Sequence, residues 1–154
     1  MAKANKTMDS ITGDIQVKGE LKGLRHGTGK FSKAEEYSIG FQPDEVEEVR
    51  TELAQYYAHY EGRAKTFIPE FVTGDKDIIN LRSGFDIPLL MGTVETSVEK
   101  LIADYGTPKA GTRCTVIIKI KVNEDGKTAL YPKAIRLPEE SEIEFYSIAN
   151  MFED

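Results

Sequence analysis

The chain has 154 residues, of which 40% are hydrophobic and 30% are charged, as in an ordinary globular domain. No apolar run approaches the roughly 20 residues that span a bilayer, and the polar amino terminus lacks the apolar stretch of a signal peptide. The single cysteine, Cys114, can form neither an intrachain disulfide nor a thiolate metal cluster. These features predict one soluble domain in a reducing cytoplasm.

Charge is distributed unevenly along the chain. Residues 1–33 carry seven Lys or Arg and three Asp or Glu, whereas residues 34–137 carry thirteen and seventeen. Residues 138–154, called the acidic tail below, carry six acids and no base, so the rest of the chain is formally neutral. A basic start and an acidic end suggest a nucleic-acid-binding protein with a regulatory or partner-binding tail. The alternative is a solvated terminus.

Two strands are predicted in the first third of the chain. Residues 1–10 are polar and predict a flexible terminus, and residues 11–24 predict a strand because their apolar side chains fall on alternate positions. Residues 25–30 contain two glycines and predict a loop. A short strand is predicted at residues 37–41, where apolar and polar or small residues again alternate.

The clearest helix signal follows these strands. Pro43 stands at the expected start, and the acidic residues after it complement the positive end of a helix dipole. Gly62 stands at the expected end. Apolar side chains recur at the helical period and define one buried stripe, formed by Val46, Val49, Leu53, Tyr56, Tyr57 and Tyr60. We therefore expect one long helix with an acidic outer face.

The second half of the chain is predicted to contain short elements separated by turns. Residues 96–99 (TSVE) resemble a capping box, which predicts a short helix that ends near Tyr105. Residues 112–122 form the strongest strand signal, with one wholly apolar face and lysines on the other. Residues 123–126 predict a hairpin turn into a partner strand at 128–137, in which Pro132 indicates a sheet edge or a bulge.

The order of these elements predicts a mostly β fold with one long inserted helix, in the α+β class. Curved, glycine-bearing strands fit a five-stranded Greek-key barrel of the OB type, whereas the strand–helix alternation of a doubly wound sheet is absent. We expect residues 11–137 to form this domain, flanked by residues 1–10 and by the acidic tail.

Residues suited to catalysis are sparse. The only histidines are His26 and His59, and the sequence lacks a P-loop and a dinucleotide-binding fingerprint. Neither a metal site nor a cofactor is predicted from one cysteine and two histidines. Asp14 and the run at 20–22 (ELK) loosely resemble the metal-holding pattern of some nucleases, so a metal-dependent nuclease is the third alternative for the function.

Features suited to binding nucleic acid are better represented. Lys or Arg can contact phosphates while aromatic rings stack on bases, and both kinds of side chain interleave near the predicted loop. These candidates are Lys22, Arg25, Lys30, Phe31, Lys33 and Tyr37. Arg82 and Phe85 form a similar pair in a turn, and Lys119 and Lys121 project from the polar face of their strand. The alternative is a solvated sheet face with the aromatic residues in the core.

Several segments, in this order, resemble the phage-encoded single-stranded DNA-binding proteins of the OB-fold type that serve replication and recombination. The shared plan is the strand at 37–41, a long early helix and a short strand that ends at Arg82. The plan continues with a glycine-flanked segment that leads to Arg113 at the start of the lysine-bearing strand. A final strand and an acidic tail that contains aromatic residues complete it. The resemblance implies an OB fold, single-stranded DNA as the partner and Arg113 as a further contact residue.

We therefore expect a non-enzymatic phage protein that coats single-stranded DNA with little sequence preference, in replication or recombination, in the host cytoplasm. The alternative is a phage protein-interaction module, a host-protein inhibitor or an assembly factor, which the net charge of −6 favours. A homodimer is left open.

The acidic tail is expected to compete with DNA and to bind replication or recombination proteins. It is shorter and less acidic than the tails of the family and does not end on an aromatic residue. Its candidate partner-binding residues are Glu139, Glu140, Glu142, Glu144, Phe145, Tyr146, Phe152, Glu153 and Asp154. The alternative for this segment is a short helix packed on the barrel.

Overall fold

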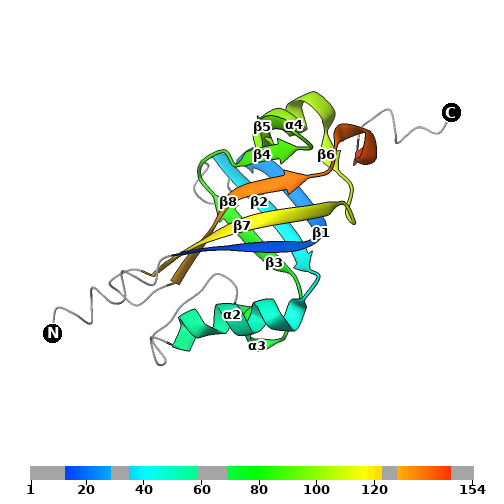
Figure 1. Cartoon of the computed structure of the whole chain (residues 1–154). Helices are drawn as coiled ribbons and strands as arrows, with labels where there is room; N and C mark the ends of the chain where they lie inside the picture. The colour runs from blue at the N-terminus through cyan, green and yellow to red at the C-terminus, as the bar shows by residue number, and fades with distance from the viewer. Residues whose placement is uncertain (1–12, 29–34, 59–68, 123–127, 147–154) are drawn as a thin grey trace.

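The computed structural model describes residues 13–28, 35–58, 69–122 and 128–146 of the chain (Figure 1). Within these residues the protein is mostly β, as predicted, with short helices. A seven-stranded sheet has the order β3-β2-β1-β7-β8-β4-β5, and β6 pairs with β9 in a second, two-stranded sheet. The strands are β1 (Gly13–Thr28), β2 (Glu35–Pro43), β3 (Ile79–Ser83), β4 (Pro88–Met91), β5 (Val94–Ser97), β6 (Thr107–Pro108), β7 (Arg113–Val122), β8 (Thr128–Leu137) and β9 (Phe145–Tyr146).

Strand β1 is the longest element and has antiparallel partners on both sides. Its first half pairs with β7, from Gly13 to Glu20, and its second half pairs with β2, from Gly19 to Thr28. A register shift between Leu21 and Gly23 marks a bulge, which bends the strand between its two partners. Residues 25–28, predicted as part of a loop, instead continue this strand because β2 supplies their hydrogen-bond partners.

The sheet curls on itself into a barrel-like shape. Strand β8 pairs in parallel with β4, and β3 contacts β8, so the two sides of the curved sheet meet. The inward side chains of β1, β2, β3, β7 and β8 form the core together with residues of the helices. The prediction of five strands was wrong in number, since the short hairpin β4–β5 and the pair β6–β9 add further strands to the described part.

The helices are α2 (Val46–Ala58), α3 (Pro69–Thr73), α4 (Val98–Tyr105) and the 3₁₀ turn η1 (Glu140–Glu142). Helix α2 begins after Pro43, which is the last residue of β2, and its 13 residues run to Ala58, where this described stretch of the chain stops. Leu53 of the predicted apolar stripe is buried, and Val46 and Val49 pack against the core. Tyr60 and Gly62 lie outside the described residues, as do the side chains of Tyr56 and Tyr57.

Helix α4 confirms the predicted short helix that ends at Tyr105, although its cap is Ser97 and not Thr96 of the predicted capping box. The hydroxyl of Ser97 accepts a hydrogen bond from the backbone N–H of Lys100 at 3.2 Å, which satisfies one of the free donors of the first turn. Gly106 ends the helix with a φ of 98°, a conformation that other residues rarely adopt. None of the described helices is long and apolar enough to cross a membrane.

Strands β7 and β8 form the predicted antiparallel ribbon. The apolar face of β7, from Cys114 to Ile120, is buried, while Lys119 and Lys121 are exposed on the opposite face. The register shifts between Ile117 and Ile118, opposite the segment that contains Pro132, so the bulge predicted from the proline is present. The predicted turn at 123–126 lies outside the described residues.

The described part of the acidic tail packs on the domain. Ile143 is buried, Phe145 stacks on Tyr105 with ring centroids 5.4 Å apart, and β9 pairs with β6. Gly106 allows this approach, because a Cβ there would lie 2.4 Å from the backbone oxygen of Tyr146. The packed structure therefore continues beyond 137, through Tyr146, and removal of everything after Pro138 would delete core contacts. Phe152, Glu153 and Asp154 lie outside the described residues.

The two faces of β7 allow a matched test of the fold. Ile118 is fully buried, whereas its neighbour Ile117 faces outward and is half-buried. Replacing Ile118 by Ala should lower the free energy of unfolding by about 2–5 kcal/mol, because it removes buried methylenes and leaves a cavity. Ile117→Ala should cost much less. Urea denaturation measures both, and equal losses would contradict the assignment of faces.

Candidate nucleic-acid interface

The outer face of the sheet carries rows of polar side chains across neighbouring strands. Lys18 of β1 lies opposite Thr115 of β7, which in turn lies opposite Arg136 of β8. Toward the start of β1, Lys119 lies between Asp14 and Tyr131 in the same way. Because side chains alternate along strands, these residues project away from the core.

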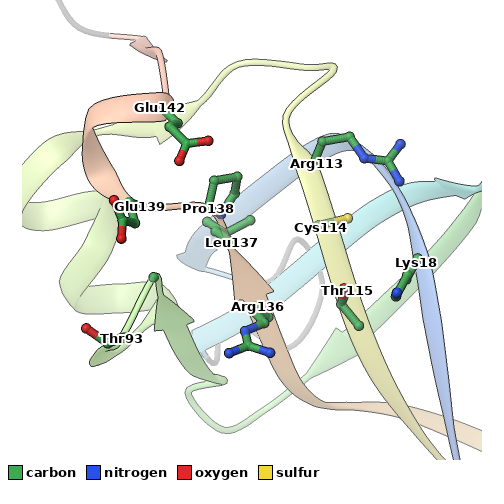
Figure 2. A pocket seen from close by; sticks show the side chains of 11 residues that line it. Lys18, Thr93, Arg113, Cys114, Thr115, Arg136, Leu137, Pro138, Glu139 and Glu142 are labelled. Carbon is green, nitrogen blue, oxygen red and sulfur yellow. The ribbon is translucent and has the colours of Figure 1, made fainter.

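An open groove runs over this face beside strands β7 and β8 (Figure 2). It has a volume of about 560 Å³ and is lined by three cations, Lys18, Arg113 and Arg136. A smaller depression of about 210 Å³ shares Thr115 and Arg136 with it and continues toward apolar side chains of β7 and β8. We call the two together the β7–β8 groove.

The acidic tail begins at one end of this groove. Glu139 and Glu142 line the larger depression together with the three cations, as Figure 2 shows. Gly92 lets the tail approach, since a Cβ there would lie 2.8 Å from Cγ of Glu139. The backbone N–H of Gly92 also donates to the carbonyl of Leu137 at 3.0 Å. Two carboxylates are thus held beside the basic residues by packed structure.

Some of the outer cations already have acidic partners. Arg113 makes a two-point contact with Asp44, one bond of which measures 2.8 Å, and this hydrogen bonding lowers the pKa of Asp44. Lys133 lies 2.6 Å from Asp14. Within the described ranges, by contrast, neither Lys119 nor Arg136 has a carboxylate within 4.0 Å, so both can meet an anion without breaking an ion pair.

The first predicted basic–aromatic region is only partly on the outer face. Lys22 and Arg25 are exposed on β1, and Lys22 lies 3.7 Å from Glu20. Lys30, Phe31 and Lys33 lie outside the described residues.

Tyr37 was predicted on the nucleic-acid face but lies in the core. Its side chain is only 4% exposed, and its ring stacks on His26 with centroids 4.5 Å apart. Its hydroxyl donates to Glu99 at 3.0 Å. Tyr37 occupies an inward position of the alternating strand β2, so it has no free face for a base.

Arg82 and Phe85 form a second exposed region at the other end of β1. Ser38 lies between Arg25 and Arg82 in the strand pairing, which brings the two arginines onto one row. Phe85 is 84% exposed, and hydrogen bonds between Ser83 and the backbone of Phe85 hold its turn. The structure therefore places Arg25 on one row with Arg82, although the two are distant in sequence.

Sequence reasoning missed four residues of the outer face: Lys18, Tyr131, Lys133 and Arg136. Lys18 and Arg136 alternate with buried neighbours, so the period of two could have revealed them. Tyr131 is 41% exposed beside Lys119, but the bulge near Pro132 obscures this register in the sequence.

The residues considered for catalysis do not converge. Asp14 and Glu20 lie on the same strand, opposite Lys119 and Arg113 respectively, and six residues of strand separate them by about 20 Å. One metal ion cannot bridge that distance. Burial raises the pKa of the Cys114 thiol to about 12, so it remains protonated at neutral pH and is a poor nucleophile.

The chain matches no family model, and no curated protein matches it significantly. Two solved structures resemble it, both of the single-stranded DNA-binding protein from bacteriophage Enc34. The carboxy-terminally truncated form has a TM-score of 0.48 at 15% identity, over 86% of this chain and 89% of that chain. The form in complex with ssDNA has a TM-score of 0.47 at 16% identity, over 85% and 89%.

The contact between Arg113 and Asp44 can be tested in solution. Loss of the guanidinium in Arg113→Ala should raise the pKa of Asp44 toward its ordinary value, because the hydrogen bonds to the carboxylate disappear. Carbon-detected NMR titration of the Asp44 carboxyl measures this shift. Arg136→Ala, which removes another cation of the same groove, is the control and should leave the pKa of Asp44 nearly unchanged.

Proposed function

We propose that this protein binds single-stranded DNA along the outer face of β1, β7 and β8. The observation that carries the proposal is the β7–β8 groove, where Lys18, Arg113 and Arg136 line an open depression. Next to it, the exposed ring of Tyr131 lies opposite Lys119. Cations that contact phosphates and rings that stack on bases are the two elements of single-strand binding.

The basic residues extend beyond the groove. Lys22 and Arg25 follow along β1, and Arg82 and Phe85 lie at its far end. Eleven residue steps separate Asp14 from Arg25, which corresponds to about 36 Å of strand. A surface of this length offers several successive contacts to one extended strand of DNA. We infer little sequence preference, because these side chains suit phosphates and the faces of bases.

We further propose a non-enzymatic role in phage DNA replication or recombination, in the host cytoplasm. Many copies of the protein would coat the single-stranded DNA. The segment after Tyr146 would recruit replication or recombination proteins. The phage setting rests on the sequence resemblance, and the binding role rests on the groove.

A protein-interaction module is the second candidate. Exposed acids Glu45, Glu47, Glu48 and Glu52 gather at the start of α2 and along its outer side. Such a surface suits a basic protein partner. The two candidates can be told apart by DNA binding at different salt concentrations. The affinity of a DNA-binding protein for single-stranded DNA should fall steeply as salt rises, whereas a protein that binds only proteins should not bind single-stranded DNA even at low salt.

The proposal is tested by fluorescence anisotropy with a labelled dT oligomer and a duplex of equal length. The single strand should bind more tightly at matched salt, because its bases are free to stack on exposed rings. Equal or tighter binding of the duplex would overturn the proposal, and no binding to either would favour the protein-interaction module.

Replacing both Lys119 and Lys121 by Ala should weaken binding to the dT oligomer. The slope of log affinity against log salt should fall by about one to two units, as expected for lost phosphate contacts. The fold should persist because both side chains are exposed. Lys100→Ala, on the exposed surface of α4, is the control and should leave the slope unchanged. An unchanged slope in the double variant would remove these lysines from the interface.

Removing the charges of Glu139 and Glu142 should strengthen DNA binding. The two carboxylates line the groove and compete with phosphate from a fixed position, so the double Gln variant should bind several-fold more tightly at low salt. The gain should shrink as salt rises, since screening weakens the competition. Glu140→Gln with Glu144→Gln removes the same charge from tail residues that do not line the groove. Equal gains in both variants would show a general charge effect instead.

A further inference from the structure

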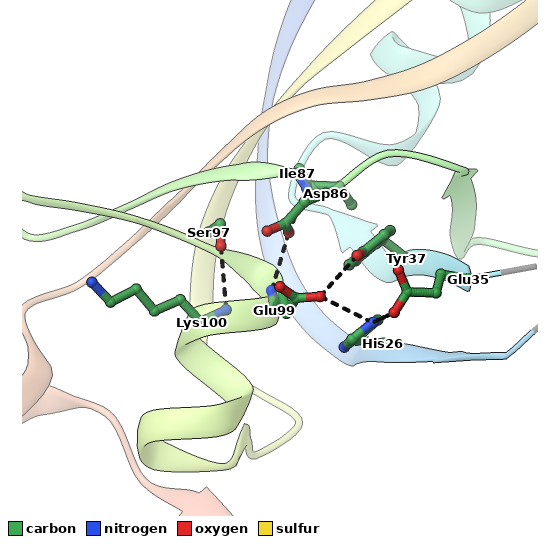
Figure 3. Close-up of polar contacts among 8 residues, drawn as sticks. All are labelled: His26, Glu35, Tyr37, Asp86, Ile87, Ser97, Glu99 and Lys100. Carbon is green, nitrogen blue, oxygen red and sulfur yellow. Dashed lines mark hydrogen bonds and ion pairs between the residues drawn. The ribbon is translucent and has the colours of Figure 1, made fainter.

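A cluster of three possible metal ligands lies where the end of the β1–β2 hairpin meets α4 (Figure 3). Nε2 of His26 lies 3.2 Å from Oε1 of Glu35 and 3.4 Å from Oε1 of Glu99. All three ligand atoms lie within 4.8 Å of one another. The residues come from β1, β2 and the first turn of α4, so only the fold brings them together.

The two short distances match the spacing of ligands around a tetrahedral metal ion. Zinc bonds to His nitrogen and carboxylate oxygen measure about 2.0–2.2 Å, which places neighbouring ligand atoms about 3.3–3.6 Å apart. The distances from His26 to Glu35 and to Glu99 lie at or just below this range. A divalent ion at the centre of the three would bond to the imidazole lone pair and neutralise both carboxylates.

A surrounding set of contacts holds two of the ligands in place. Tyr37 stacks on the His26 ring with an angle of 1° between the planes, and its hydroxyl donates to Oε1 of Glu99. Oε1 has a second lone pair that remains free for a metal. Asp86 accepts from the backbone N–H of Glu99 at 3.1 Å and fixes the first turn of α4.

The cluster is open to solvent on one side. The side chain of Glu35 is 65% exposed and that of Glu99 is 49% exposed, whereas that of His26 is 21% exposed. An ion can therefore enter, and water can complete its coordination shell. Imidazole favours zinc and its neighbours over magnesium or calcium, which prefer all-oxygen sites.

We propose that His26, Glu35 and Glu99 bind a divalent transition-metal ion of the zinc type, which would link the β1–β2 hairpin to α4. None of the three ligands belongs to the proposed DNA surface, and metal binding at this site does not require DNA. Residues 26 and 99 lie far apart in the chain, so only the folded state presents the three ligands together, and binding of the ion would stabilise that state.

Calorimetric titration of untagged, chelator-treated protein with zinc chloride tests the site. One ion should bind per chain, and the melting temperature should rise with zinc concentration because the ion binds the folded state. Magnesium chloride should neither bind tightly nor displace zinc. Cobalt(II) gives an independent readout, since a tetrahedral site produces intense visible absorption.

Variants assign the ligands. Glu35→Gln and His26→Ala should each weaken zinc binding at least about 10-fold. A loss of this size in metal affinity already follows when a residue that only hydrogen-bonds to a metal ligand is replaced. Glu35 is mostly exposed, so its variant should remain folded. Asp104→Asn removes an exposed charge from the other end of α4 and should bind zinc like the parent. Absence of stoichiometric binding, or binding that persists in both ligand variants, would overturn the proposal.

Discussion

The pairing of β1 with two different partners is the constraint on which the rest of the fold depends. The strand pairs with β7 through Glu20 and with β2 through Thr28, and the bulge after Leu21 bends it between the two. At this point the backbone of Leu21 donates to Thr112 and accepts from Gly111, both at 2.7 Å. A straight strand would extend one flat sheet, whereas this bend lets β3 approach β8 and close a core between them.

The bend also shapes the outer face of the sheet. Side chains that alternate with the core residues of β1, β7 and β8 project onto a single convex surface, and most of its charged members are basic. The surface is not uniformly cationic, because Asp44 and Asp14 pair with Arg113 and Lys133. A DNA phosphate would have to displace those carboxylates, but it could contact Arg136 and Lys119 directly. In the proposed binding mode, competition between phosphates and these carboxylates would affect the affinity for DNA more than the net charge of the chain does.

The ends of β1 carry opposite chemistry. Its first half lies beside the basic groove, whereas His26, near its end, lies next to the carboxylates of Glu35 and Glu99. The acidic tail adds a third contribution, since its first turn packs at the end of the groove while Ile143 and Phe145 anchor it to the body. The described part of the tail thus combines side chains that pack on the domain with carboxylates that line the basic groove.

The sequence by itself determined the elements whose signals are local. The alternation in β7, the return strand with its bulge at Pro132 and the short helix α4 were all predicted, because each depends on side-chain period, ring geometry or hydrogen bonds within a few residues. The exposure of Lys119 and Lys121 followed from the same period. Local periodicity therefore accounts for the best-predicted part of the fold.

Only the tertiary structure decided what depends on distant partners. Residues 25–28 include Gly27, which is typical of a loop, but they extend because β2 satisfies their backbone. Tyr37 is buried because its ring stacks on His26 and its hydroxyl donates to Glu99. Strand pairing places Lys18 and Arg136 in one groove, although they are far apart in the sequence. The proposed metal site likewise takes its residues from three elements that are distant in the chain. Such contacts leave no local period in a single sequence, since their free energy is gained only when the sheet curls and the segments meet.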